Sequence, residues 1–82
     1  MMKLGYFLHV TPSGEFLVKI TGGRVPRLGW RVVNGSGKLL GKVRDIIGPV
    51  RAPYAVVKPA GTLNLKPYEE VFVKPSSRRW RK

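Results

Sequence analysis

Residues 3–20 read KLGYFLHVTPSGEFLVKI, and this stretch indicates the fold class of the chain. Alternate residues are apolar on both sides of a polar centre: Leu4, Tyr6, Leu8 and Val10, and then Phe16, Val18 and Ile20. A period of two is typical of a strand with one buried face. Pro12-Ser13-Gly14 between the two halves is a turn signal. The stretch therefore predicts a β-hairpin.

The rest of the chain favours strands over helices in the same way. Ten glycines and seven prolines are spread through 82 residues, and no run free of both is longer than seven residues. Both residues are unfavourable inside helices, so a long helix is excluded. Further strands are expected at Trp30–Val33, Lys38–Ile47, Pro53–Lys58 and Tyr68–Val73. About six short strands in one domain can bury an apolar face and remove their edges by closing into a small barrel. We expect an all-β barrel domain over residues 1–73 and a short basic tail over 74–82.

The composition excludes several classes of enzyme. The chain has no cysteine, one histidine (His9) and four acidic residues, against 16 Lys and Arg, for a formal net charge of +12. Ligands for a metal site are scarce. The adjacent acids Glu69 and Glu70 would point to opposite faces of a strand, so they cannot act as a carboxylate pair. We expect no catalytic activity, no cofactor and no metal. The charge indicates polyanions, or an assembly that contains them, as partners.

No apolar run approaches the length that spans a membrane, and the N-terminal residues show no leader pattern. The expected location is therefore cytoplasmic, with no membrane partner.

The segment 46–57 carries more apolar residues than a small barrel can bury. Ile46 and Ile47 are adjacent, and Val50, Tyr54 and four further apolar residues follow closely. Along a barrel strand only alternate residues point inward, so apolar groups remain outside whichever set is buried. Two interpretations stay open. The segment is an exposed protein-binding surface, or a neighbouring loop or a β-bulge accommodates the second apolar set within the chain itself.

Residues 40–59, LGKVRDIIGPVRAPYAVVKP, combine Gly-x-Val-x-Asp, then Gly-Pro-Val-x-x-Pro-Tyr, then an apolar pair and Lys-Pro. This pattern closely resembles the core signature of the Gar-family subunit of H/ACA ribonucleoproteins. Leu4-Gly5 with Leu8-His9 resembles the first strand of that family, and Val25–Leu28 resembles its second turn. The resemblance covers nearly the whole chain.

The resemblance implies a closed six-stranded barrel similar to those of translation factors. It also implies a non-catalytic subunit that binds the dyskerin-like pseudouridine synthase and assists rRNA substrate placement and product release. Contacts with other H/ACA proteins, guide RNA and substrate would be mainly indirect. Ile47 stands where the family commonly has an aromatic residue, and the Gly-Arg-rich flanks of eukaryotic members are absent, so the chain resembles the archaeal type.

The residues expected to bind the partner lie on this segment: Ile46, Ile47, Gly48, Pro49, Val50, Arg51, Pro53 and Tyr54. The cations Lys42, Arg44, Arg51 and Lys58 are interpreted either as flanking charges that steer docking or as ordinary solvated side chains. Asp45 is expected to form an ion pair with a neighbouring arginine. A lone apolar patch of this kind could also pair with a second copy of the isolated protein.

A second group of candidates lies in the tail, where an aromatic residue alternates with cations: Arg78, Arg79, Trp80, Arg81 and Lys82. Such a sequence suits base stacking and phosphate contact with single-stranded RNA, or it is a basic tail without fixed structure. The alternative function for the whole chain is a freestanding basic RNA-binding barrel. The net charge favours it, whereas Tyr6, Phe16 and Phe72, on faces that we expect to be buried, argue against a stacking platform.

Overall fold

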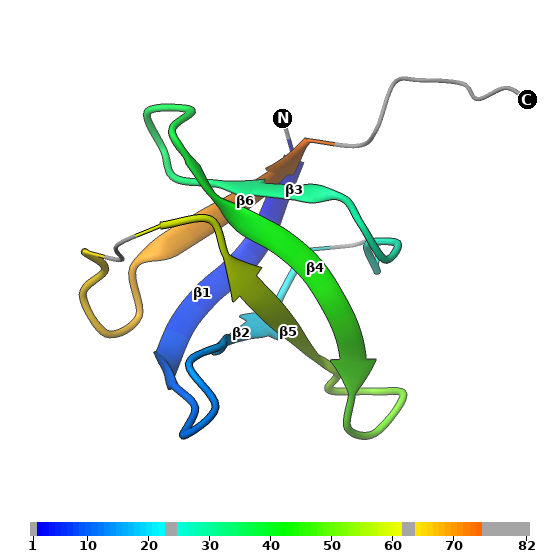
Figure 1. Ribbon diagram of the computed structural model, residues 1–82. Coiled ribbons are helices and arrows are strands. Elements are labelled where there is room, and N and C mark those ends of the chain that lie inside the picture. Colours follow the sequence, from blue (N-terminus) through cyan, green and yellow to red (C-terminus); the bar gives the residue numbers. More distant parts are fainter. Residues whose placement is uncertain (1, 23–24, 62–63, 75–82) are drawn as a thin grey trace, which may run out of the picture.

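The computed structural model describes residues 2–22, 25–61 and 64–74. Six antiparallel strands make up the fold: β1 (Met2–Val10), β2 (Phe16–Ile20), β3 (Arg31–Val33), β4 (Leu39–Ile47), β5 (Tyr54–Pro59) and β6 (Glu70–Lys74). They form one closed barrel in the order β1-β2-β5-β4-β3-β6 (Figure 1). The prediction of a closed six-stranded all-β barrel is confirmed. None of the described residues belongs to a helix that could cross a membrane. Of the predicted tail, residues 75–82 lie outside the described residues.

Local turn chemistry explains two of the hairpins. Between β1 and β2, the amide of Thr11 donates to the carbonyl of Glu15, and Gly14 has a φ of 89°. Between β3 and β4, Oδ1 of Asn34 accepts hydrogen bonds from the amides of Ser36 and Lys38. An Asn side chain that replaces a backbone partner in this way stabilises a tight turn. Both turns lie where Gly, Pro and Asn cluster in the sequence.

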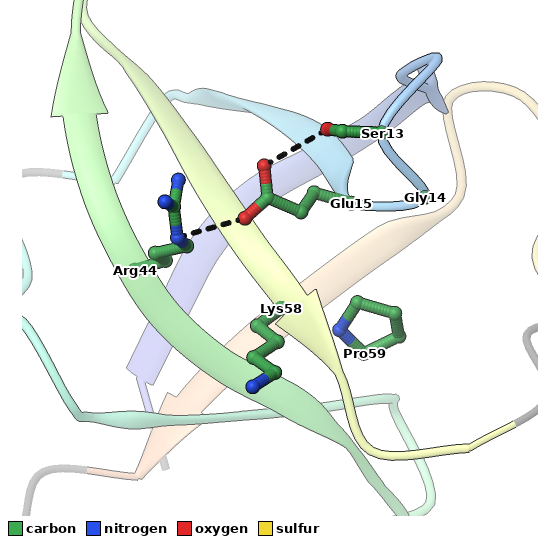
Figure 2. Close-up of a pocket in the computed structure, with 6 residues that line it drawn as sticks. All are labelled: Ser13, Gly14, Glu15, Arg44, Lys58 and Pro59. Atoms are coloured by element: carbon green, nitrogen blue, oxygen red, sulfur yellow. Dashed lines mark hydrogen bonds and ion pairs between the residues drawn. The ribbon is translucent and has the colours of Figure 1, made fainter.

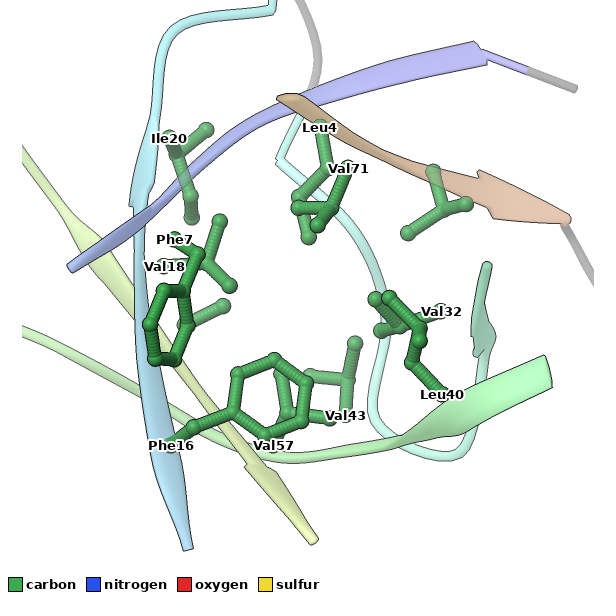
Figure 3. Close-up of a cluster of buried hydrophobic side chains, with 12 residues drawn as sticks. Leu4, Phe7, Phe16, Val18, Ile20, Val32, Leu40, Val43, Val57 and Val71 are labelled. Carbon is green, nitrogen blue, oxygen red and sulfur yellow. The ribbon is translucent and has the colours of Figure 1, made fainter. Parts of the chain in front are cut away.

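The barrel interior is filled by apolar side chains from all six strands (Figure 3). Phe7 and Phe16 pack edge to face with their ring centroids 5.8 Å apart, a favoured arrangement for aromatic pairs. The other members of the core are aliphatic: Leu4, Val18, Ile20, Val32, Leu40, Val43, Ala55, Val57, Val71 and Val73. Four partly buried apolar residues pack against this cluster: Met2, Trp30, Ile46 and Leu65.

The expected buried face of β1 is wrong beyond Leu4. The interior receives Phe7, whereas Val10 is exposed and Tyr6 is only half-buried. The pairing of β1 shifts register between Lys3 and Gly5 on one side and between Phe7 and His9 on the other. Each such β-bulge changes which residues point inward and bends the strand, as closure of a small barrel requires.

The faces expected for the three aromatic residues are therefore only partly correct. Phe16 is fully buried, but Tyr6 and Phe72 are half-buried. The ring of Tyr6 lies edge-on to the exposed Tyr68, with 5.6 Å between centroids. Tyr6 and Tyr68 thus place aromatic rings on the outer surface of the barrel, contrary to the expected burial of Tyr6.

Candidate protein-binding site

The predicted partner-binding residues lie together at one end of the β4–β5 hairpin. Ile47, the last residue of β4, is the cross-strand partner of Tyr54, the first residue of β5. The loop 48–53 joins them and extends beyond the barrel wall (Figure 1). We call the segment Ile46–Tyr54 the ridge.

A β-bulge in β4 decides which of the two adjacent isoleucines is buried. The pairing of β4 with β5 shifts register between Val43 and Asp45. Beyond this shift Ile46 packs against the core, whereas Ile47 remains 42% exposed. The bulge interpretation is thus correct for Ile46 only. It directs one isoleucine inward and leaves its neighbour on the surface.

The second apolar set of the segment 46–57 is covered on β5 and uncovered at the tip of the ridge. Val56 is 8% exposed although it does not belong to the core cluster, and its cross-strand partners are Leu17 and Asp45. At the tip of the loop, Val50 is 96% exposed. The chain therefore covers Val56 with its own residues and leaves Val50 fully in solvent.

Several contacts hold the ridge in one shape. Gly48 has a φ of 92°, a conformation that residues with a Cβ rarely adopt. The amide of Ala52 donates to the carbonyl of Pro49 at 3.1 Å, which closes a turn. The carbonyl of Pro53 accepts a hydrogen bond of 3.2 Å from the amide of Ile20 on β2. A preformed loop loses little conformational entropy when a partner binds it.

Tyr54 is supported from two directions. A Cβ on Gly48 would lie 3.1 Å from Cδ1 of the Tyr54 ring, so the ring packs closely against the glycine backbone. On the other strand, Nζ of Lys19 lies 5.5 Å from the ring centroid, within the range of a cation–π contact. Sequence reasoning missed Lys19, because its proximity depends on the pairing of β2 with β5. No local signal in the sequence reports that pairing.

The cations expected to flank the ridge are distributed differently. Arg51 is exposed on the ridge itself. Arg44 instead forms an ion pair of 2.9 Å with Glu15 on the neighbouring part of the barrel. Lys42 and Lys58 are partners of each other, further along the hairpin. All four cations are exposed, as expected of solvated side chains, and their role in steering a partner stays a prediction.

The ion pair expected for Asp45 is wrong. Its Oδ1 accepts a 2.8 Å hydrogen bond from the amide of Ile46. Arg44, its sequence neighbour, is engaged with Glu15. A carboxylate at a bulge can satisfy a backbone amide that the disrupted ladder leaves unpaired, and this local role explains Asp45.

A shallow groove of about 350 Å³ lies beside the β1–β2 turn (Figure 2). It is lined by Ser13, Gly14, Glu15, Arg44, Lys58 and Pro59. The carboxylate of Glu15 already binds both Arg44 and the hydroxyl of Ser13, at 2.9 and 3.2 Å. The charges of Glu15 and Arg44 in this groove are therefore already paired with each other.

His9 is exposed, and its Nδ1 lies 3.2 Å from the carbonyl oxygen of the adjacent Val10. Within the described ranges, no group of three or more His, Asp or Glu side chains could hold a metal ion. The candidate RNA-binding residues Arg78, Arg79, Trp80, Arg81 and Lys82 lie outside the described residues.

Comparison with known proteins identifies a relative of the chain. The chain is 38% identical over 69 residues to an uncharacterized protein of Methanothermobacter thermautotrophicus, and the match covers 84% of this chain and 73% of that protein. No protein-family model matches the chain.

Proposed function

The chain belongs to the family of the Methanothermobacter thermautotrophicus protein, and we propose that its members are non-catalytic subunits of an H/ACA-type guide-RNA ribonucleoprotein. In this proposal the ridge binds the catalytic domain of a dyskerin-like pseudouridine synthase. The catalytic aspartate belongs to that partner. The chain assists placement of the rRNA substrate and release of the pseudouridylated product.

One observation carries the proposal: Val50 is 96% exposed at the tip of a braced loop. An apolar side chain in that position contributes nothing to the barrel core. Gly48, Pro49 and Pro53 give the loop a fixed shape, which a partner can bind without ordering it first. The resemblance noted in residues 40–59 spans the ridge, so it supports a partner of the H/ACA type.

The contribution of the ridge to the free energy of binding can be estimated from the apolar side chains that a partner would bury. Burying a Val or Ile side chain contributes about 1.5–3 kcal/mol, so Ile47 and Val50 together supply a substantial share of a stable complex. Tyr54 adds a large ring with few torsions, which is a favoured interface anchor. The position of Lys19 against this ring fixes its orientation before binding.

A freestanding RNA-binding barrel is the second candidate, and one observation favours it. The pair Tyr6–Tyr68 forms an aromatic surface on the outside of the barrel. However, Glu69 and Glu70 follow Tyr68 directly, and carboxylates beside the rings repel phosphates. The pair is therefore a poor platform for RNA, and the ridge remains the better supported site.

The test is co-purification of the tagged protein with the synthase at about 0.5 M salt, where phosphate contacts weaken steeply and an apolar interface persists. Val50→Glu and Tyr54→Ala should each remove the synthase from the pull-down while circular dichroism still reports a folded barrel. Retention of the synthase by both variants would show that the ridge is not the interface. Size-exclusion chromatography of the protein alone tests whether the same surface pairs with a second copy.

A further inference from the structure

Four cations form a continuous row across four neighbouring strands of the barrel. Arg31 on β3 is the cross-strand partner of Lys74 on β6 and of Lys42 on β4, and Lys42 is in turn the partner of Lys58 on β5. These strands are adjacent in the barrel order β5-β4-β3-β6 (Figure 1). All four side chains are exposed. We call Lys74, Arg31, Lys42 and Lys58 the basic row.

The basic row is electrostatically unfavourable for the protein alone. Neighbouring strands lie about 4.8 Å apart, so four positive charges occupy about 14 Å. Like charges directly opposite each other destabilise a sheet, whereas alternating charges would stabilise it. In the described part of the chain, the ion pairs are Lys3–Glu70 and Arg44–Glu15, and neither includes a member of the row. An anion bound along the row would relieve this repulsion.

The row differs from the surfaces that bind proteins. Lysine is depleted in protein interfaces, and three of the four cations are lysines. Lysine is a common ligand of phosphate, which it binds as a point charge. A linear series of cations without interleaved carboxylates matches a linear polyanion. We infer that the basic row binds the phosphodiester backbone of a single-stranded nucleic acid.

The inference goes beyond the proposed function and does not rest on it. Lys42 lies five residues from Ile47 on β4, and Lys58 lies four residues from Tyr54 on β5. At about 3.3 Å per residue, the row and the ridge are about 13–17 Å apart along the hairpin. The row and the ridge therefore lie at different positions along the hairpin. The barrel itself, and not only its basic tail, would contact nucleic acid.

The test compares two variants of the full chain with equal charge. The row variant carries Arg31→Gln, Lys42→Gln and Lys58→Gln. The control variant carries Arg27→Gln, Lys38→Gln and Lys66→Gln, which are exposed positions outside the row. Both variants remove one arginine and two lysines and both keep residues 75–82. Thermal melting followed by circular dichroism checks that both are folded.

Binding of a fluorescent 20-nucleotide poly(U) is then measured by anisotropy from about 0.05 to 0.3 M salt. Each lost phosphate contact on a single strand lowers the slope of log K against log salt by about 0.7, so the row variant should lose about 2 from the slope and on the order of a hundredfold in affinity at 0.1 M salt. The control variant should lose about threefold, from the general reduction in charge. Equal losses in both variants would overturn the inference.

Two further probes identify the ligand class. Poly(dT) of the same length should show the same loss in the row variant, because the contact is to phosphates. Tighter binding of poly(U) than of poly(dT) would indicate an additional contact with 2′-hydroxyls. Poly-L-glutamate should bind more weakly than either. If poly-L-glutamate bound as tightly and lost as much affinity in the row variant, the row would be a site for an acidic protein and the inference would be wrong.

Discussion

Ile47 and Tyr54 face each other across the last pair of β4 and β5, and together they form the base of the loop that carries Val50. Ile47 is 42% exposed, and Tyr54 is held between Gly48 and Lys19. The strand pairing that closes the barrel thus also sets the position of the loop outside it. Changes at the base should lower both the stability of the folded barrel and the affinity of the site, whereas changes at the tip should lower only the affinity.

The Gly48→Ala variant tests the base of the ridge. The φ of 92° disfavours any side chain, and the new Cβ would press on the ring of Tyr54. We expect a loss of about 1–3 kcal/mol in the free energy of unfolding, measured by urea denaturation. Gly14→Ala is the matched control, since Gly14 has a φ of 89° with open space around it. A smaller effect at Gly48 than at Gly14 would contradict the packing described for Tyr54.

The Val50→Asp variant tests whether the side chain at the tip of the ridge contributes to the stability of the barrel. Because Val50 is almost fully exposed, the substitution should change the free energy of unfolding by less than about 0.5 kcal/mol. Phe16→Ala in the core should cost about 3–5 kcal/mol by the same measurement. A large loss of stability in Val50→Asp would mean that Val50 is covered by its own chain.

Closure of the barrel depends on a close approach at Gly5. A Cβ at this position would collide with the carbonyl oxygen of Lys19 on β2. Gly5→Ala should therefore lower the midpoint of thermal unfolding strongly, as expected of a substitution that forces two strands apart. Gly61→Ala, where nothing lies near the added Cβ, should leave the midpoint almost unchanged. Equal midpoints for the two variants would contradict the β1–β2 pairing.

The basic row predicts an increase in stability from a single charge reversal. Lys42 has like-charged cross-strand partners on both sides, Arg31 and Lys58. Lys42→Glu would replace two repulsive pairs with two attractive ones and should raise the free energy of unfolding by about 0.5–1 kcal/mol at low salt. The gain should shrink at about 1 M salt, because exposed charges are screened. No gain at low salt would show that the row is not under electrostatic strain.

The alternation of apolar and polar residues, together with the turn residues, predicted most of the fold. Phe16–Ile20 and the turns at Gly14 and Asn34 follow from local patterns, since a strand and a tight turn are specified by neighbouring residues. The ridge was also predictable, because its residues exceed what one interior can bury. These features need no knowledge of which strands pair.

Features that depend on pairing between distant strands could not be predicted. The bulges in β1 and β4 invert the face of Phe7 and decide which of Ile46 and Ile47 points inward, and no local pattern marks them. The contact of Lys19 with Tyr54 and the alignment of Arg31 with Lys42 arise only once register is set. A shift of one residue in register moves a side chain to the opposite face of the sheet. These cross-strand neighbours therefore cannot be predicted from a single sequence.

The most direct test of the account is the affinity of the full chain for the dyskerin-like synthase, measured by titration calorimetry with two matched variants. Ile47 and Leu39 are the two ends of β4 and are 42% and 43% exposed. Ile47→Glu places a charge on the ridge and should weaken binding at least about a hundredfold, since it removes an apolar contact and buries a charge. Leu39→Glu should bind like the unaltered protein. Equal affinity of the two variants, or a loss confined to Leu39→Glu, would contradict the claim that the ridge is the partner-binding surface.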